Sequence, residues 1–320
     1  MHLVIQLLAV VVGVGLIVFG AETFAEHLSA ASARLGVTAF ALAVLLAGAE
    51  PEELATTVTA SLRHSPGIAY GDVIGANIAM CLVALGVGAL VADLPLAGPA
   101  RTYGLLGLPL GAVAAALAWG GQLSRAEGAL LVGLYIAFVG SVWLIERRPP
   151  ALGEAGEVAE AVEELGAGRR TPSRVGREMV LVLVGVAATI AGAVLLVDGV
   201  RGMAHVESTQ TRLGLILVGF ATAFELVVLA WSSARRGITE AVVAGVIGSF
   251  AYNVTMSMGA AAMARPMHLL RAPQLHGPWV AMLVCLGAVL ALSLPTGKLT
   301  RATGVGLILA YPLVAGFVLA

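Results

Sequence analysis

The chain has 320 residues, of which 59% are hydrophobic and only 12% are charged, and its mean hydropathy is +0.97. A soluble domain carries about twice this share of charged residues, and a single globular core of this length cannot bury so much apolar surface. The composition therefore excludes an ordinary soluble protein and predicts that lipid is the solvent. The net charge of −1 argues against a nucleic-acid partner.

Ten apolar segments of about 17 to 25 residues follow one another, each long enough to cross a hydrocarbon core of about 30 Å. They lie near residues 3–24, 37–61, 68–92, 102–119, 126–145, 179–200, 211–234, 239–263, 278–294 and 303–319. We therefore expect an all-α integral membrane protein, with a first five-helix repeat in residues 1–145 and a second in 179–320. Cys81 and Cys285 lie far apart in apolar segments without metal-ligand spacing, and are expected to be small core residues.

One long polar stretch, residues 146–178, separates the two sets of five segments and is expected to be a solvated linker. The odd-numbered loops carry twelve Lys and Arg residues, six of them in this stretch, and the even-numbered loops carry six. Because cytoplasmic loops are enriched in Lys and Arg, the linker is predicted to be cytoplasmic and both termini to lie outside. The expected location is the inner (plasma) membrane of the cell, crossed many times.

The two halves resemble each other when the chain is laid over itself, without a gap, so that Glu52 falls on Glu225. We call this alignment the repeat register; it also places Arg63 on Arg236, and Val73-Ile74-Gly75 on Val246-Ile247-Gly248. Because each half has an odd number of segments, the second half would enter the membrane from the opposite side. Inverted repeats with a site at their interface, near the bilayer midplane, are typical of secondary transporters.

Three acids and a proline interrupt the second segment, in the sequence AGAEPEELATT at residues 47–57. An intramembrane acid costs several kcal/mol unless it forms a pair, binds a cation or faces water, so Glu50, Glu52 and Glu53 predict bound cations or protons. Glu50 and Glu53 would share one helix face. Pro51 frees a carbonyl on the preceding turn, and carboxylates with free carbonyls form the hard-oxygen site that Ca²⁺ prefers. The alternative places the acids at a helix end in the headgroup layer.

In the second half, the stretch GFATAFELVVLAW holds a single acid, Glu225, in an otherwise apolar segment. An acid in this setting is a functional candidate by default. The next segment of each half adds neutral oxygens from Asn77, Ser249 and Asn253. An Asn in a membrane helix, however, forms a hydrogen bond between helices as often as it binds a ligand. Asp72 lies about one turn from a predicted helix start, so capping or solvation is as well supported as a cation path.

These segments resemble the α-repeats of the Ca²⁺/cation antiporter superfamily, the sodium/calcium exchanger family. Members carry G-T-S-L-P-E-L-x-T-S followed by a helix that begins G-N-x-I-G-S-N-I. Here GAEPEELATT and GDVIGANIAM occupy these places in the first repeat, and GFATAFELVVLA and AGVIGSFAYN in the second. The resemblance implies ten helices in two inverted five-helix repeats, with α-repeats at about residues 45–90 and 218–263. It also implies a cation bound by acids and oxygens from the four repeat helices.

The chain departs from the family motif at several ligand positions. In the first repeat Glu53 falls on the family's ligand Glu, Glu50 replaces a ligand Ser, and Met80 stands at the final Asn/Asp position. In the second repeat the ungapped match places Leu226 on the ligand Glu, and a shift of one residue would restore Glu225 to it. The site therefore keeps its acids but distributes them unevenly, which leaves the ion and its stoichiometry open.

We therefore predict a secondary active antiporter that exchanges Ca²⁺, or a similar cation, for H⁺ or Na⁺ by alternating access at a midplane carboxylate site. The expected cation-binding residues are Glu53 and Glu225 as principal carboxylates, Glu50 and Asn253 to complete the metal site, and Asn77 and Ser249 as weaker candidates, with Glu52 as the proton-coupling candidate. Repulsion among clustered carboxylates favours protonation of at least one of them, which favours H⁺ slightly.

Two other classes of function fit the sequence less well. An intramembrane hydrolase is disfavoured because the motifs HExxH and GxSxG are both absent, so we expect no enzyme activity, no catalytic residue and no cofactor other than the transported cation. A membrane sensor that binds a cation through degenerate repeats, without transporting it, is the stronger alternative. Leu226 and Met80, which replace two expected ligands, support it. The expected partners are inorganic cations and the lipid bilayer, and the oligomeric state stays open.

Overall fold

The structure, a computed structural model, describes residues 2–34, 50–146, 175–237 and 239–319. Within these ranges nine helical spans are long and apolar enough to cross a membrane. They match nine of the ten predicted segments. The remaining segment, near 37–61, is described only from residue 50, and most of the predicted linker lies outside the described residues. The all-α membrane architecture is therefore confirmed.

The first half contains α1 (His2–Arg34), α3 (Pro51–Leu62), α4 (Pro66–Ala79), α5 (Leu85–Val91), α6 (Pro99–Ala118) and α7 (Arg125–Glu146). The second contains α9 (Val175–Met203), α10 (Glu207–Leu213), α11 (Gly219–Arg235), α12 (Thr239–Tyr252), α13 (Met258–Ala264), α14 (Pro273–Ser293) and α15 (Arg301–Leu319). Three π-helical turns join successive helices into longer spans: η1 (Met80–Ala84), η2 (Gly214–Val218) and η3 (Asn253–Ser257). Helices satisfy their own backbone hydrogen bonds, which is why a chain in lipid forms them.

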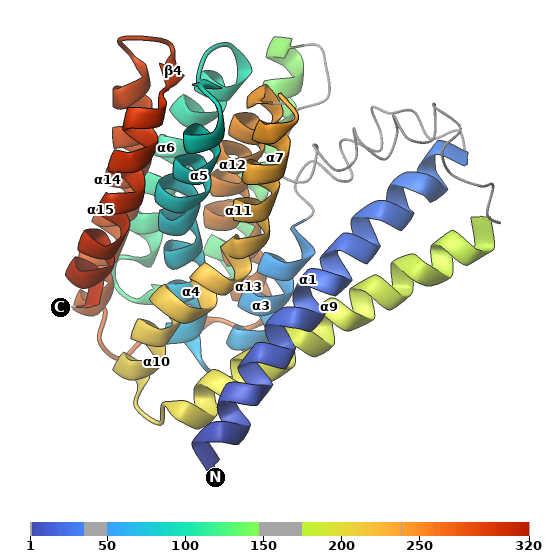
Figure 1. The fold of residues 1–320 in the computed structure, drawn as a ribbon. Coiled ribbons are helices and arrows are strands. Elements are labelled where there is room, and N and C mark those ends of the chain that lie inside the picture. The colour runs from blue at the N-terminus through green and yellow to red at the C-terminus, as the bar shows by residue number, and fades with distance from the viewer. Residues whose placement is uncertain (1, 35–49, 147–174, 238, 320) are drawn as a thin grey trace.

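Helices α1 and α9, the first described helix of each half, lie side by side along one flank of the molecule (Figure 1). Glycines form their contact. A Cβ atom on Gly13 would lie 2.8 Å from the carbonyl oxygen of Gly192, and one on Gly20 would lie 2.7 Å from that of Gly185. The two glycines of α1 have the same spacing as the two glycines of α9. The first glycine of each helix contacts the second glycine of the other, so the contact is two-fold symmetric. Small residues allow this close approach of two membrane helices.

The remaining helices form a bundle with the same inverted symmetry (Figure 1). Two short antiparallel pairs join its loops: β1 (Leu94–Pro95) with β4 (Lys298–Leu299), and β2 (Gln122–Leu123) with β3 (Met267–His268). The repeat register places β1 on β3, so the two pairs occupy corresponding loops. When the loops are numbered along the chain, β1 and β4 both lie in odd-numbered loops, and β2 and β3 both lie in even-numbered loops. Loops of one set lie on the same side of the membrane in a ten-helix topology, so these pairings agree with it. The predicted inverted repeats are confirmed.

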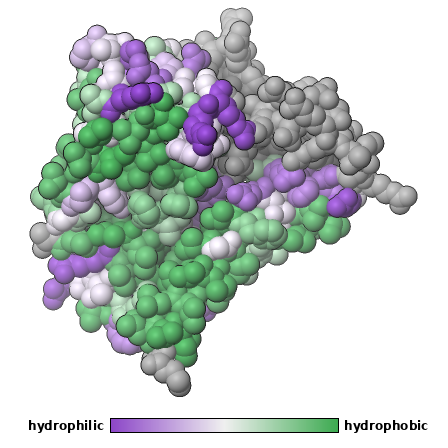
Figure 2. Space-filling view, viewed as in Figure 1, coloured by the Kyte–Doolittle hydropathy of each residue, from purple (hydrophilic) through white to green (hydrophobic). Residues whose placement is uncertain are grey.

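Helix α4 is the most deeply enclosed part of the first half, and every residue after Pro66 is buried. It packs on the α10–η2–α11 span so closely that a Cβ atom on Gly75 would clash with the backbone carbonyl of Leu215. Figure 2 shows a mainly apolar outer face with polar residues gathered toward its ends. This distribution is the reverse of a soluble protein's surface and fits a lipid environment.

We expect the substitution Gly75→Ala to destabilise the bundle, because the added methyl group meets rigid backbone that cannot move aside. Overpacking of this kind costs about 1–3 kcal/mol. The matched control is Gly15→Ala on α1, where a Cβ atom meets nothing within 4 Å and the helix propensity of Ala gives a small gain. Thermal unfolding of the two purified variants in the same detergent measures the difference. Equal midpoints would contradict the backbone contact of α4.

Candidate functional site

Helix α3 begins where the acidic stretch lies. Pro51 is its first residue, a position where the missing N–H of proline leaves no hydrogen bond unmade. Glu50 precedes the helix with a non-helical backbone (φ −94°, ψ 80°), while Glu52 and Glu53 lie in the first turn. Glu50 therefore stands at the cap and not inside the helix, although it still lies close enough to Glu53 to interact with its charge. The positive end of the helix dipole favours carboxylates at all three positions.

The three acids stand at a helix end, as the alternative expected, and they are buried inside the protein. The exposed fraction is 1% for Glu50, 3% for Glu52 and 0% for Glu53. Both carboxylate oxygens of Glu53, and Oε2 of Glu50, accept no hydrogen bond of ordinary geometry from any described residue. The nearby Thr222 hydroxyl, which interacts with Glu53, donates to Asp72. Asp72, Glu50 and Glu52 lie close enough to Glu53 to interact with its charge. We call these four residues the acid cluster; it concentrates negative charge that a cation or protons would offset.

Asp72 on α4 joins the two halves of the protein. Its side chain is fully buried, so the readings as a cap or a solvated residue are wrong. Its Oδ2 accepts a hydrogen bond from Thr57 Oγ1 of α3, and its Oδ1 accepts one from Thr222 Oγ1 of α11, both at 3.0 Å. Neither threonine stood out in the sequence, because a hydroxyl becomes informative only when its buried acceptor is known.

A second link between the halves runs from Glu50 to α12, where the hydroxyl of Ser249 donates a hydrogen bond to Glu50 Oε1. Nearby in sequence, Asn253 begins η3, and Met80, its counterpart in the repeat register, begins η1. The amide nitrogen of Asn253 lies 3.9 Å from Met80 Sδ. Equivalent positions of the two repeats therefore meet. Single π-helical turns often mark functional sites, and no feature of the hydrophobic pattern indicated them.

Asn77 is buried on α4, and its amide nitrogen lies 2.9 Å from the carbonyl oxygen of Val73, to which it donates, and 3.7 Å from Met282 Sδ of α14. Its Oδ1 accepts no hydrogen bond from a described residue. The nitrogen is thus occupied by structural contacts, whereas the oxygen is available as a ligand.

Glu225 lies on α11, three residues after Thr222, and both its carboxylate oxygens are shielded from solvent. Helix α3 ends at Leu62 and α11 ends at Arg235, which are equivalent in the repeat register. The buried positions follow the same register, pairing Glu53 with Leu226, Thr57 with Ala230, and Ala60 with Ser233. This register places buried Leu226 at the equivalent of Glu53, and Glu225 at the equivalent of Glu52.

Among the described residues, no group of three or more His, Cys, Asp and Glu side chains is arranged to hold a metal ion by itself. A hard cation at the acid cluster would therefore need neutral oxygens as well. Ser249, Asn253 and Asn77 are the sequence-predicted candidates for them. This mixed donor set agrees with the 6–8 oxygen ligands of Ca²⁺, of which carboxylates are only a part.

A family model for the sodium/calcium exchanger protein matches residues 5–144 and 178–320, which together cover both halves. The chain belongs to the sodium/calcium exchanger protein family. Membership makes it a multi-pass membrane protein of the cation antiporter kind.

Individual relatives agree with this assignment over most of the chain. The putative antiporter CaxA of Alkalimonas amylolytica is 27% identical over 290 residues, which cover 89% of this chain and 86% of CaxA. The uncharacterized membrane protein MJ0091 of Methanocaldococcus jannaschii is 26% identical over 289 residues, covering 90% and 87%. A structure of the sodium-calcium exchanger NCX_Mj, soaked with 10 mM Na⁺ and zero Ca²⁺, shares the fold with a TM-score of 0.62 at 19% identity, covering 98% and 99% of the two chains.

We expect Thr222→Val to destabilise the protein, because it removes the hydroxyl that donates to Asp72 and leaves a buried carboxylate oxygen without that donor. Such a loss costs about 1–3 kcal/mol. Thr189→Val on α9 is the control, since the buried Thr189 hydroxyl donates only to the carbonyl oxygen of Gly185 in its own helix. Thermal unfolding in detergent compares the two variants. An equal loss of stability would show that the hydrogen bond to Asp72 stabilises the protein no more than a threonine bond within its own helix does.

Proposed function

We propose that this exchanger-family protein exchanges Ca²⁺, or a similar cation, for H⁺ or Na⁺ by alternating access at the acid cluster. One observation carries the proposal: both carboxylate oxygens of Glu53 are fully buried and accept no hydrogen bond from the described residues, at the interface of two inverted repeats. Buried oxygens of this kind need a compensating positive charge. A transported cation supplies it in one part of the cycle, and the driving ion supplies it in the other.

In this proposal the carboxylates of Glu50 and Glu53 bind the cation from the first half. Ser249 and Asn253 add oxygens from the second half, and Asn77 adds its carbonyl oxygen. Glu225, the neighbour of Leu226 on α11, is proposed as the carboxylate that the second half contributes. Met80 offers a thioether, which hard cations such as Ca²⁺ do not favour. The negative charge of the site thus comes mainly from the first half.

The number of acids favours protons as the driving ions. Glu50, Glu52, Glu53 and Asp72 are all buried, and four carboxylates exceed the charge of one divalent cation. Like charges in a buried site favour protonation of some of them. Glu52 is the proposed proton carrier, and Asp72 adds a further group that can take a proton.

Alternating access requires a part of the structure that moves relative to the site, and we assign this role to the α1–α9 pair. One helix comes from each half, and the pair packs tightly on itself through glycines. Its contacts with the bundle run mainly between α9 and α3, the helix that carries Glu53. A displacement of the pair would therefore open or close the approach to the acid cluster.

The orientation follows from the loops. The pairing of β1 with β4 joins two odd-numbered loops, and the pairing of β2 with β3 joins two even-numbered loops. The odd-numbered loops therefore lie at one end of the bundle and the even-numbered loops at the other. We propose that the odd-numbered loops and the central linker, which hold most Lys and Arg residues, face the cytoplasm of a cell whose plasma membrane holds the protein. The termini would then lie outside.

A sensor that binds a cation without transporting it is the alternative, and buried Leu226 and Met80 favour it because each replaces an oxygen ligand of the family motif. Binding alone cannot separate the two functions, since both need an occupied site. Flux separates them, because a sensor binds its cation without turnover.

The deciding experiment is Ca²⁺ uptake into proteoliposomes under an imposed Na⁺ gradient and, separately, an imposed pH gradient. We expect uptake with one gradient, and a decrease of at least about tenfold in Glu53→Gln, which removes the central negative charge. The control Glu127→Gln changes a partly exposed acid at the start of α7 and should transport normally. Binding of Ca²⁺ without uptake under either gradient would favour the sensor, and normal uptake by Glu53→Gln would exclude the proposed site.

We also expect the apparent affinity for Ca²⁺ to fall as the pH is lowered from about 8 to about 6, because protons and the metal compete for the same carboxylates. The dependence should be weaker in Glu52→Gln, which removes one proton-binding group but leaves the proposed ligands in place. Calcium titrations of the purified protein over this range measure it. An affinity that does not change with pH would argue against proton coupling and leave Na⁺ as the driving ion.

A further inference from the structure

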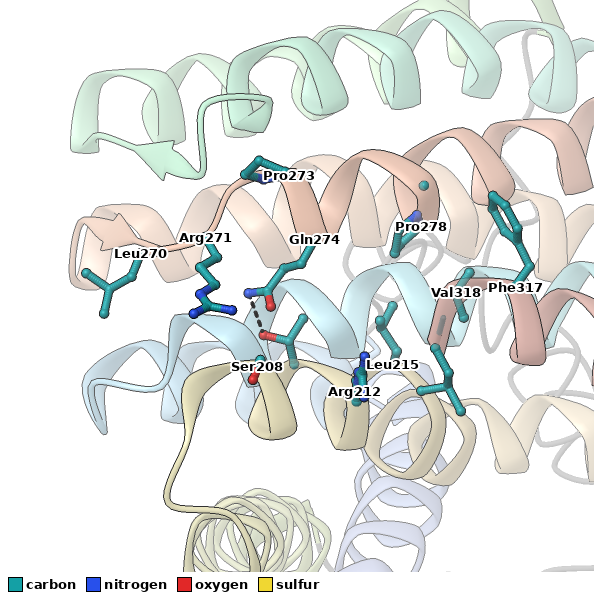
Figure 3. Close-up of a pocket in the computed structure, with 13 residues that line it drawn as sticks. Ser208, Arg212, Leu215, Leu270, Arg271, Pro273, Gln274, Pro278, Phe317 and Val318 are labelled. Carbon is teal, nitrogen blue, oxygen red and sulfur yellow. Dashed lines mark hydrogen bonds between the residues drawn. The ribbon is translucent and has the colours of Figure 1, made fainter.

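A hollow of about 600 Å³ lies between α10, α14 and α15, far along the chain from the acid cluster. Figure 3 shows its lining, with Arg212 and Leu215 on one side, Gln274 and Pro278 on the opposite side, and Phe317 with Val318 near one end. One end of the hollow, which we call its mouth, lies beside the loop that precedes α14, where Leu270 and Arg271 line it (Figure 3). Its volume is in the range of small-molecule sites.

Two positive charges line the hollow, Arg271 at its mouth and Arg212 further in (Figure 3). Arg212 and Arg271 both line it, both are exposed, and neither forms an ion pair with a residue in the described ranges. The nearest acid along the chain, Glu207, is occupied by a hydrogen bond of 2.9 Å from the backbone N–H of Leu270 and lines a neighbouring hollow instead. Gln274 donates to Thr211 Oγ1 at 3.2 Å, which fixes its amide at the polar mouth. This chemistry favours an anion.

The lining changes from basic to apolar along the hollow, away from its mouth. Arg271 precedes α14 and lies at the level of a helix end, whereas Arg212 lies about 7.5 Å into the span that begins at Glu207. Leu215 lies about 4.5 Å further along its span than Arg212, and Pro278 about 6 Å further than Gln274. Phe317 comes from α15, and its side chain is 61% exposed. The order of charged mouth and apolar interior matches the order of headgroup and acyl chain in a phospholipid.

We propose that this hollow binds an anionic phospholipid, with the phosphate between Arg212 and Arg271 and one acyl chain against Leu215, Phe317 and Val318. Basic pockets between membrane helices commonly take anionic headgroups. A soluble phosphate would use the arginines but would gain nothing from the apolar half. The proposal does not depend on which ion the acid cluster binds.

Native mass spectrometry tests it on the full-length protein in detergent, given equal amounts of phosphatidylglycerol and phosphatidylcholine with identical chains. We expect one phosphatidylglycerol to be retained in preference, and the preference to fall about fivefold for each arginine lost in Arg212→Gln and Arg271→Gln. The matched control is Arg125→Gln, which removes an exposed positive charge from the start of α7, at the same end of the bundle but outside the hollow.

Two outcomes would overturn the proposal. One is a lipid preference that is absent, or that Arg125→Gln lowers as much as the two hollow variants do. The other is displacement of the bound lipid by inorganic phosphate together with unchanged retention in Phe317→Ser, which would show a site for free phosphate. The three arginines and Phe317 are exposed, so gel filtration should show every variant folded like the parent protein.

Discussion

The burial of carboxylates inside a lipid-embedded bundle is the constraint on which the rest of this structure depends. Glu53 has no exposed surface and two oxygens without donors among the described residues. Three features make that position tolerable: the start of α3 supplies a helix dipole, Thr57 and Thr222 solvate the neighbouring Asp72, and Ser249 binds Glu50. The hydrogen bonds from Thr222 and Ser249 cross between the halves. The interface of the repeats therefore holds buried negative charge, and in our proposal an ion completes it.

The sequence predicted the helices and the repeat because both have local signatures. Apolar length is sufficient to identify a membrane span, and the repeat register was visible in matched acids, bases and glycines. The burial of the three acids was also correctly inferred, since their flanks are apolar. The backbone at Glu50 was not, because helix spacing cannot show that Pro51 begins the helix rather than bending it. The hydrogen bond from Thr222 to Asp72 depends on contact across 150 residues of chain, which no local pattern contains.

The repeats are symmetric in backbone and asymmetric in chemistry. The strand β3 and the turn η3 follow β1 and η1 in the repeat register, and the glycine contact of α1 with α9 is symmetric, so the two halves keep one architecture. At the site, however, Leu226 is the counterpart of Glu53, and Met80 that of Asn253. A symmetric scaffold does not require symmetric ligands, because a cation responds to the total charge and oxygen number around it and not to which repeat supplies them. In the proposed site, the additional acids of the first half supply the charge that the second half lacks.

The packing also separates what can move from what cannot. Helix α4 lies against the α10–η2–α11 span with backbone touching backbone, and Asp72 ties the same helices together by hydrogen bonds. An interface this close is rigid, since closely packed groups resist deformation. The α1–α9 pair is equally tight internally but, within the part of the chain that the structure describes, it meets the bundle mainly through α3. Motion should therefore occur at the boundary between the pair and the bundle, where fewest contacts are lost. In our proposal this motion changes access to the acids at the start of α3 while the ligand geometry stays fixed.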